Sequence, residues 1–209
     1  MQAYQTLLQS ASDEYLIHKS RFIGQAAPAS TTEEALAFLG RVREEHREAN
    51  HHCYAYIIGK NAGIMRYSDD GEPGGTAGMP MMEVLKARGV VNCVAVVTRY
   101  FGGVLLGAGG LVRAYSHTCA LALNAARVCE MHLTQRWMLE VPYPLWDRVQ
   151  HRMKSLLIRM GEVTFTTAVS FEVSVKAVES EQLLAELVRV TDGRIEMLML
   201  EEDYAPWEQ

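Results

Sequence analysis

The stretch VVNCVAVVTRYFGGVLLGAGGLVRAY, residues Val90–Tyr115, indicates a buried strand, a glycine-rich loop and a helix in direct succession. The run Val90–Arg99 is almost continuously apolar and rich in β-branched residues, as expected for a central strand that is covered on both faces. A helix is predicted over Leu111–Ala126, where alanine side chains allow close packing on a sheet. Upstream, Thr31 and Glu34 form a reciprocal capping pair, which predicts another helix beginning after Thr31.

A second glycine-rich segment, SDDGEPGGTAGMP, covers Ser68–Pro80. Before it, two predicted strands, His52–Gly59 and Gly63–Ser68, form a hairpin. After it, a short helix is predicted from Pro80 to Gly89, with proline at its start and glycine at its end. The segment Ser68–Pro80 follows an edge hairpin, and the glycine-rich loop after Arg99 follows a central strand of the same sheet. We therefore expect the two segments to converge on one side of the first domain.

The tail predicts a second domain. Its residues Val169–Lys176 alternate between apolar and polar, the period-two pattern of a half-buried strand. The other predicted elements are a strand at Trp137–Val141, a helix at Leu145–Met160 that ends at Gly161, a helix at Ser180–Thr191 and a strand at Arg194–Leu200. Together with a hairpin before Val169, they give the β-α-β-β-α-β order of a ferredoxin-like unit, in which two helices cover one face of an antiparallel sheet. We predict an α+β protein with two domains, residues 1–134 and 135–209.

The charge is unevenly distributed along the chain. The formal net charge is -5, and residues 137–209 contribute 7 basic and 13 acidic groups, or -6, which leaves +1 for the rest. This balance disfavours a protein that wraps nucleic acid, and we expect no DNA partner. Because the start shows no signal-peptide pattern and no run is long enough to span a membrane, we expect a cytoplasmic protein without a membrane partner.

The cysteines fit no metal or redox motif. Cys53, Cys93, Cys119 and Cys129 lack CxxC spacing, and we predict reduced core residues with neither a disulfide nor a structural zinc. The histidine cluster around His51 and His52 is not an HExxH motif, and neighbouring strand residues point to opposite faces. We therefore expect at most one of these two histidines at any site.

Three carboxylates, Asp69, Asp70 and Glu72, are crowded into one turn. They could hold a divalent cation, form an acid–base pair or simply make a solvated turn. Both the GxGxxG and the P-loop patterns fail at the other glycine-rich segment. Its turn at Gly107–Gly110, directly before a helix that carries Arg113, could hold an anion or could only permit tight packing.

Three long strings resemble the YigZ/IMPACT family: EANHHCYAY from Glu48, YSDDGEPGGTAGMPMMEVL from Tyr67 and VTRYFGGVLLGAGGLVRAY from Val97. The tail is similar to the second domain of its bacterial members. The resemblance implies that the first domain shares the fold of elongation factor G domain IV, which is ribosomal-protein domain-2-like, and that the second is ferredoxin-like. It also implies a translation-linked role, since eukaryotic relatives restrain a kinase that slows translation during amino-acid starvation. The acidity of the tail departs from what direct RNA contact by the second domain would require.

These observations favour a non-enzymatic binding protein without a cofactor, whose partner is the ribosome, RNA or a translation-associated protein. The alternative is a phosphate- or nucleotide-binding enzyme that uses Asp69, Asp70 and Glu72 with Arg99 and Arg113. We expect ribosome or RNA binding to depend on salt and to involve Arg99, Tyr100 and Arg113. The double change Arg99→Ala, Arg113→Ala should abolish most ribosome binding while leaving the thermal midpoint nearly unchanged. The predicted binding surface comprises His51, His52, Asp69, Asp70, Glu72, Thr76, Arg99, Tyr100, Gly102, Gly103, Gly109, Gly110 and Arg113.

Overall fold

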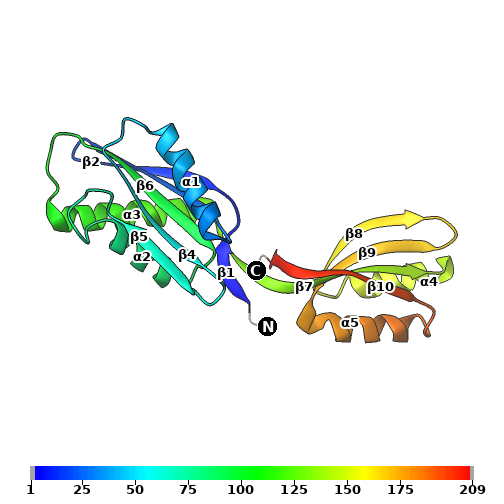
Figure 1. The fold of residues 1–209 in the computed structure, drawn as a ribbon. Coiled ribbons are helices and arrows are strands. Elements are labelled where there is room, and N and C mark those ends of the chain that lie inside the picture. The colour runs from blue at the N-terminus through cyan, green and yellow to red at the C-terminus, as the bar shows by residue number, and fades with distance from the viewer. Residues whose placement is uncertain (1–2, 208–209) are drawn as a thin grey trace. The chain divides into compact units, whose positions relative to one another are not determined.

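The computed structural model describes residues 3–207 and confirms the α+β class. The chain divides into two compact units, Tyr4–Glu130 and Met131–Trp207 (Figure 1). Each unit has its own hydrophobic core, and no residue is shared between the cores.

The first unit is built on one antiparallel sheet in the order β2-β3-β6-β4-β5. The strand β6 is therefore central and the β4–β5 hairpin lies at an edge, as the sequence predicts. The three N-terminal strands were not predicted. The elements are β1 (Tyr4–Leu7), β2 (Ala11–Ile17), β3 (Ser20–Pro28), α1 (Thr32–Glu45), β4 (His51–Ile58), β5 (Ile64–Ser68), α2 (Gly78–Ala87), β6 (Cys93–Tyr100) and α3 (Gly107–Ala126).

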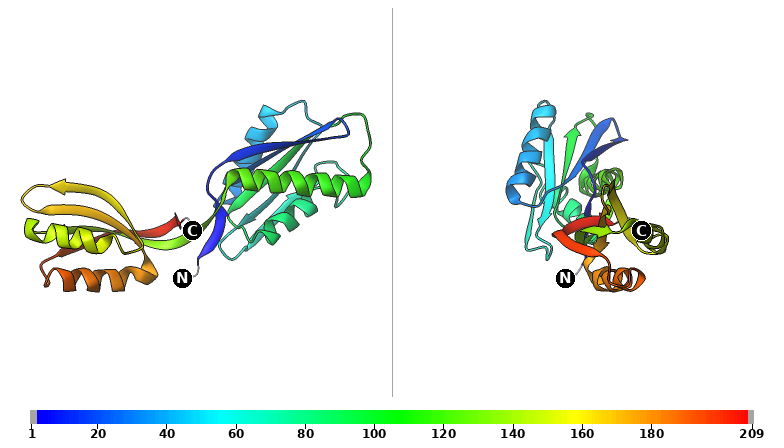
Figure 2. Two further views of the ribbon diagram at one scale, coloured as in Figure 1. Left: turned by 180° about the vertical axis from the view of Figure 1, so that it is seen from behind. Right: turned by 90° about the vertical axis from the view of Figure 1, so that its right-hand side faces the viewer.

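Helices cover both faces of this sheet, with α1 on one face and α2 and α3 on the other (Figure 2). The alternation along β6 explains why its sequence is apolar throughout. Cys93, Ala95 and Val97 belong to the core under α2 and α3, whereas Val94 and Val96 belong to the core under α1. Both faces of the strand are thus buried, as the sequence predicts.

The helix starts agree with the sequence in one case and differ in another. Thr31 caps α1 by accepting a hydrogen bond from the backbone N–H of Glu34, while the Glu34 carboxylate accepts from Ser30 rather than from Thr31. The glycine-rich turn that we expected before α3 is instead the first turn of the helix, which begins at Gly107. Glycine tolerates the left-handed φ of 68° at that position, so the helix can begin four residues earlier than the apolar pattern suggests.

The second unit has the predicted β-α-β-β-α-β order, with strands paired in the order β10-β7-β9-β8. The N-terminal strand β1 is not part of the β2-β3-β6-β4-β5 sheet and also pairs with β7. Both helices contribute to the core on one face of the sheet. The elements are β7 (Val128–Val141), α4 (Tyr143–Met153), β8 (Ile158–Phe165), β9 (Val169–Lys176), α5 (Ala177–Val190) and β10 (Glu196–Trp207).

The helix predicted over Leu145–Met160 is too long, because α4 ends at Met153 and Ile158–Phe165 is a strand. Gly161 lies within β8, at an irregularity in its pairing with β9, and does not end a helix. Met160 follows Leu156 at helical spacing and Ile158 at strand spacing, and pairing with β9 decides between the two.

Candidate functional site

The ends of β4 and β6 bring His51 and Arg99 together. These residues are opposite one another in the antiparallel register, and Phe22 on β3 is opposite Arg99 on the other side. Arg99 follows Cys93, Ala95 and Val97 at period two, so its side chain lies on the sheet face that α2 and α3 cover. The alternation that builds the core therefore also positions the cation of the site.

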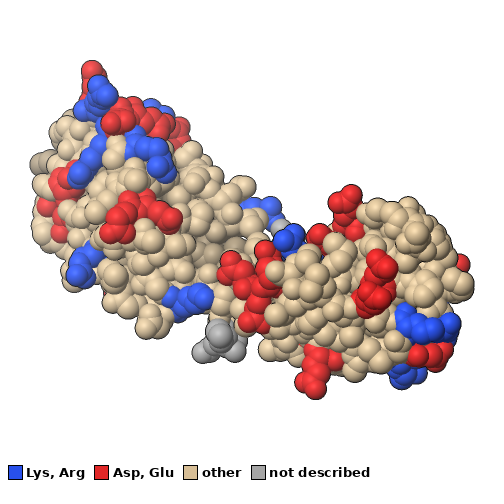
Figure 3. All heavy atoms as spheres, turned by 45° about the vertical axis from the view of Figure 1, so that its right-hand side comes forward, with Lys and Arg blue, Asp and Glu red and all other residues tan. Residues whose placement is uncertain are grey.

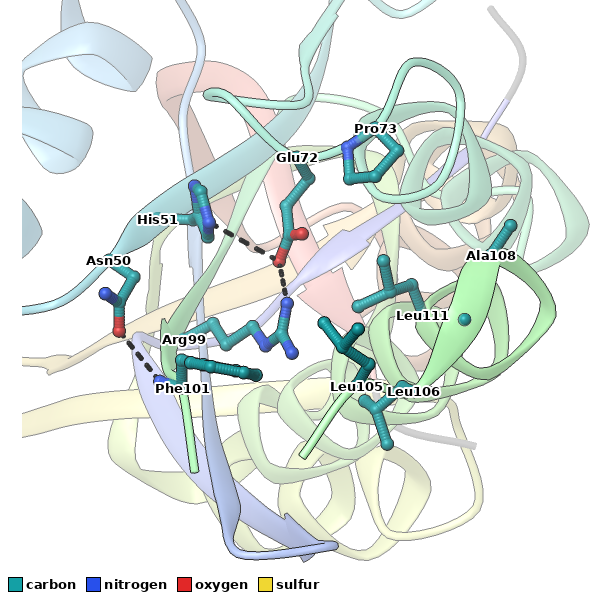
Figure 4. Close-up of a pocket in the computed structure, with 11 residues that line it drawn as sticks. Asn50, His51, Glu72, Pro73, Arg99, Phe101, Leu105, Leu106, Ala108 and Leu111 are labelled. Carbon is teal, nitrogen blue, oxygen red and sulfur yellow. Dashed lines mark hydrogen bonds and ion pairs between the residues drawn. The ribbon is translucent and has the colours of Figure 1, made fainter. Parts of the chain in front are cut away.

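Glu72 joins the two glycine-rich segments (Figure 4). Its Oε1 accepts hydrogen bonds from Arg99 Nη1 and from the Tyr115 hydroxyl, each at 2.7 Å. His51 Nε2 lies 3.9 Å from the same oxygen. The Glu72 and Arg99 side chains are only 3% and 6% exposed, so this is a buried ion pair. The predicted convergence of the two segments is confirmed, although the contact is made inside the unit.

Arg99 is held between two aromatic rings. Its guanidinium carbon lies 5.3 Å from the ring centroids of both Phe22 and Phe101, within the range of cation–π attraction. Only Nη1 has a hydrogen-bond partner among the described residues, and Nε is buried without one. Burial contradicts the prediction of an exposed Arg99 that contacts a partner, because an apolar strand has carried the residue into the core.

Asp69 organises the loop and the start of α2. Its Oδ1 accepts from the N–H groups of Ala77 and Gly78, and its Oδ2 accepts from the N–H of Gly75, at 2.8–3.0 Å. A carboxylate at a helix N-terminus satisfies N–H groups that have no partner in the helix and interacts favourably with the helix dipole. Both oxygens of the Asp69 carboxylate therefore accept hydrogen bonds from backbone N–H groups.

Asp70 points in another direction. Its Oδ2 accepts from the backbone N–H of His52 at 2.7 Å and its Oδ1 contacts Arg43 Nη2 at 3.0 Å. The three carboxylates of the turn therefore bind separate partners and do not converge, which contradicts their use as a joint magnesium site. No group of three or more His, Cys, Asp or Glu side chains with metal-binding geometry occurs among residues 3–207.

The two histidines face opposite sides of β4, as predicted. His51 Nδ1 lies 2.8 Å from the backbone oxygen of Asp70, so this nitrogen carries the proton and donates. His52 Nε2 lies 3.1 Å from the backbone oxygen of His46, on the α1 side. Burial lowers the pKa of His52, which favours the neutral ring.

The other predicted residues have structural contacts or lie elsewhere. Thr76 is buried and donates to the backbone oxygen of Pro73, and Tyr100 hydrogen-bonds His46 on the α1 side of the sheet. Arg113 is exposed and lines a different groove with Tyr15 and His117, so Arg99 and Arg113 do not form one basic patch.

The four glycines of the predicted surface have different roles. A side chain at Gly102 would collide with the backbone of Lys19, at 2.0 Å, whereas Gly103 needs its left-handed φ of 80°. Gly109 and Gly110 are in the first turn of α3, and Gly110 packs against Leu106. Glycine has no side chain with which to contact a partner, so these four residues contribute through the path of the backbone.

A pocket of about 380 Å³ opens beside the ion pair (Figure 4). It is mainly apolar and includes the start of α3. Its lining consists of Asn50, His51, Glu72, Pro73, Arg99, Phe101, Leu105, Leu106, Gly107, Ala108 and Leu111. A volume of this size is typical of small-molecule sites.

Sequence reasoning missed Tyr115 and the apolar wall of the pocket. Tyr115 is fully buried, and burial raises the pKa of its hydroxyl, so it remains a hydrogen-bond donor to Glu72. Its position eight residues after Gly107, on the buried face of α3, was the available signal. The leucines at 105 and 106 resembled ordinary loop residues and carried no signal.

The cysteines offer no activated thiol. All four are buried and unpaired. Burial raises the pKa of Cys53 to about 12, and its Sγ donates to the backbone oxygen of Asp69 at 2.9 Å. A thiol with that pKa is protonated at neutral pH, so Cys53 is a packing and loop-fixing residue.

Comparison with known proteins identifies the family. The Impact N-terminal domain model matches residues 18–123, and a model named domain of unknown function (DUF1949) matches residues 139–194. The chain belongs to the IMPACT family. It is 37% identical over 93% of its length to "IMPACT family member YvyE" of Bacillus subtilis, covering 89% of that protein, and 35% identical over 89% of its length to "IMPACT family member YigZ" of Escherichia coli, covering 92%. The predicted resemblance is confirmed.

Two further similarities extend this assignment. "Protein IMPACT homolog" of Saccharomyces cerevisiae is 33% identical over 47% of this chain and 39% of its own length. A solved structure titled "Crystal structure of an hypothetical protein" matches 97% of this chain and all of its own with a TM-score of 0.62 and 32% identity. No helix within the described part of the chain is long and apolar enough to cross a membrane.

Proposed function

We propose that this protein is a non-enzymatic regulatory protein of translation that binds a protein of the ribosome or a ribosome-associated factor. Membership of the IMPACT family supports a regulatory role, since the family resemblance implies one for its eukaryotic members. The strand order β10-β7-β9-β8, with α4 and α5 on one face, supports a ferredoxin-like second unit. The proposed fold of the first unit is that of elongation factor G domain IV, and the proposed location is the cytoplasm.

The exposed apolar loop after β6 is the observation that favours a protein partner over RNA. Phe101, Val104 and Leu105 are 44%, 41% and 86% exposed, and the segment Phe101–Val112 contains no charged residue. Protein interfaces are enriched in aromatic and apolar anchors, whereas RNA contact depends on Lys and Arg beside aromatic rings. Arg99, the cation nearest this loop in sequence, is buried in an ion pair with Glu72 and does not present an exposed cation to the backbone of an RNA.

The charge distribution supports the same choice. On the face shown in Figure 3, the Lys and Arg side chains of the first unit lie beside Asp and Glu side chains. A strongly salt-dependent RNA contact needs several cations in one place. The sequence predicts a salt-sensitive contact through Arg99 and Arg113. We propose instead an apolar contact, which salt affects little.

Co-sedimentation with purified ribosomes tests this proposal. We expect the full chain to sediment with ribosomes to a similar extent at low and high salt, and the variant Val104→Asp to lose most of that binding. Val104 does not line the pocket, so this variant leaves the pocket's chemistry intact. The control Leu16→Asp places the same charge at another exposed apolar position, on β2. Binding that disappears with moderate salt, or that Val104→Asp retains, would contradict the proposed contact.

A further inference from the structure

We infer that the pocket beside Arg99 binds the carboxylate group of a small organic acid with an apolar body. The inference is independent of the proposed ribosome contact. It rests on three features of the described residues: a buried guanidinium with unused donors, an uncapped helix start and an apolar wall.

The free edge of Arg99 is the first feature. Its side chain is 6% exposed, and Glu72 engages Nη1 while Nε has no partner. A buried polar group without a partner is costly and is rare in folded proteins. The Nε and Nη2 donors form one side of the planar guanidinium fork, which matches the two oxygens of a carboxylate. In Figure 4 the guanidinium points from β6 toward Leu105 and Leu111, into the pocket.

The start of α3 is the second feature. Gly107 and Ala108 line the pocket, and Leu106 at the N-cap position provides no side-chain hydrogen bond. The first N–H groups of a helix have no partner within the helix, and they carry a partial positive charge of about half a unit. Arg99 and these N–H groups thus border the same cavity from two different elements.

The charge of the site selects a carboxylate over a phosphate. Glu72 formally cancels the charge of Arg99, and His51 Nε2 faces Glu72 rather than the cavity wall of α3. The remaining positive potential comes mainly from the helix start. A single carboxylate charge matches this potential, whereas a phosphate group would bring about -1.5 to -2 into a site that already contains Glu72.

The wall of the pocket defines the rest of the ligand. Pro73, Phe101, Leu105 and Leu111 contribute apolar surface, and the volume of about 380 Å³ accommodates a branched or aromatic body. Burial of that body favours binding, and the carboxylate determines its orientation. A free acid of this kind is the expected ligand.

Calorimetry on the full chain tests the inference with phenylacetate, its neutral amide phenylacetamide, and inorganic phosphate. We expect phenylacetate to bind at least about tenfold more tightly than the amide, because only the acid makes charge-assisted hydrogen bonds. Amide NMR signals of Ala108–Gly110 and the Arg99 Nε–H signal should shift on addition of phenylacetate. Equal affinity for acid and amide, tighter binding of phosphate, or no saturable binding of phenylacetate would each overturn the assignment.

Variants at the pocket rim provide the control. Leu105 is 86% exposed, so Leu105→Glu should fold normally while placing a negative charge at the entrance. We expect this variant to weaken binding of phenylacetate about tenfold more than binding of the amide, because both ligands lose the apolar contact but only the acid is repelled. Leu105→Gln should weaken both ligands equally and so retain the preference for the acid. Leu36→Glu adds the same charge on α1, across the sheet, and should change neither affinity. Retention of full phenylacetate affinity in Leu105→Glu would contradict the site.

Discussion

At the scale of single residues, one carboxylate determines how the site is built. Glu72 accepts from Arg99 and Tyr115 in a buried environment, while Asp69 and Asp70 are bound by backbone N–H groups. Sequence reasoning selected all three carboxylates together, but it could not tell which partner each of them has. The carboxylates point to different partners because the loop changes direction at Asp70, which has a left-handed φ of 43°.

Replacement of Arg99 should destabilise the fold strongly. Arg99→Ala leaves the Glu72 carboxylate buried without its ionic partner, and we expect a loss of about 3–5 kcal/mol in the free energy of unfolding. The exposed Arg113→Ala should change it by less than about 0.5 kcal/mol. Urea denaturation measures both variants. A similar stability for the two variants would show that the Arg99–Glu72 pair contributes nothing.

Asp69 should stabilise the loop through its three backbone hydrogen bonds. Asp69→Asn replaces one acceptor oxygen with an amide donor and removes the charge, and we expect a loss of about 1–3 kcal/mol. Asp147→Asn on α4 is the matched control, and its effect should be small. Hydrogen exchange of the N–H groups of Gly75, Ala77 and Gly78 should accelerate in Asp69→Asn alone; unchanged exchange would refute the capping role.

Protonation of His52 should destabilise the folded state in mild acid. Its pKa in the fold is lowered by burial, below the unfolded value of 6.5. The unfolded chain therefore binds more protons, so the stability contributed by neutral His52 is complete above pH 6.5 and is lost as pH falls below it. The urea midpoint of the wild type should decrease more between pH 7 and 5 than that of His52→Gln. Parallel decreases would exclude this contribution.

At the scale of elements, the sequence predicts strands and helices best where burial and period agree. The run before Arg99 is apolar on both faces, and the structure confirms it as the central strand β6. Prediction fails where long-range pairing decides: Ile158–Phe165 becomes a strand only through β9, and α3 begins inside its glycine-rich turn. The burial of Arg99 was not predicted for a similar reason. The sequence alone does not show which loop residue will pair with a cation at the end of a strand.

The contact of α3 with β3 depends on a glycine. A side chain at Gly24 would lie 2.6 Å from the backbone oxygen of Thr118, so Gly24→Ala must separate the helix from the sheet. We expect a loss of about 1–3 kcal/mol in the free energy of unfolding. Gly40 on α1 has no atom within 4 Å of the same position, and Gly40→Ala should stabilise by about 0.5–1 kcal/mol. Thermal unfolding of both variants distinguishes packing from helix propensity; stabilisation by Gly24→Ala would contradict the close contact.

At the scale of the whole molecule, the chain joins two units that bury separate cores. The first unit has two cores, one on each face of its sheet, and contains the pocket, whose lining residues lie between Asn50 and Leu111. The second unit has one core and contributes -6 to the net charge of -5 when counted from residue 137. The proposed function uses the exposed loop after β6 on the first unit, and the second unit differs from the first in net charge.

Separate cores predict separate unfolding. Phe171 is fully buried in the core of the second unit, and Phe171→Ala should cost about 3–5 kcal/mol there. Hydrogen exchange followed by mass spectrometry should then show lost protection in β7–β10 and unchanged protection in β3, β4 and β6. The reason is that Phe171 belongs to the core of the second unit and to neither core of the first. The reciprocal variant Leu85→Ala, in the first unit, should produce the opposite pattern. If either variant removed protection from both units together, the two units would form one cooperative structure, and the proposed loop contact would have to be studied in the intact chain alone.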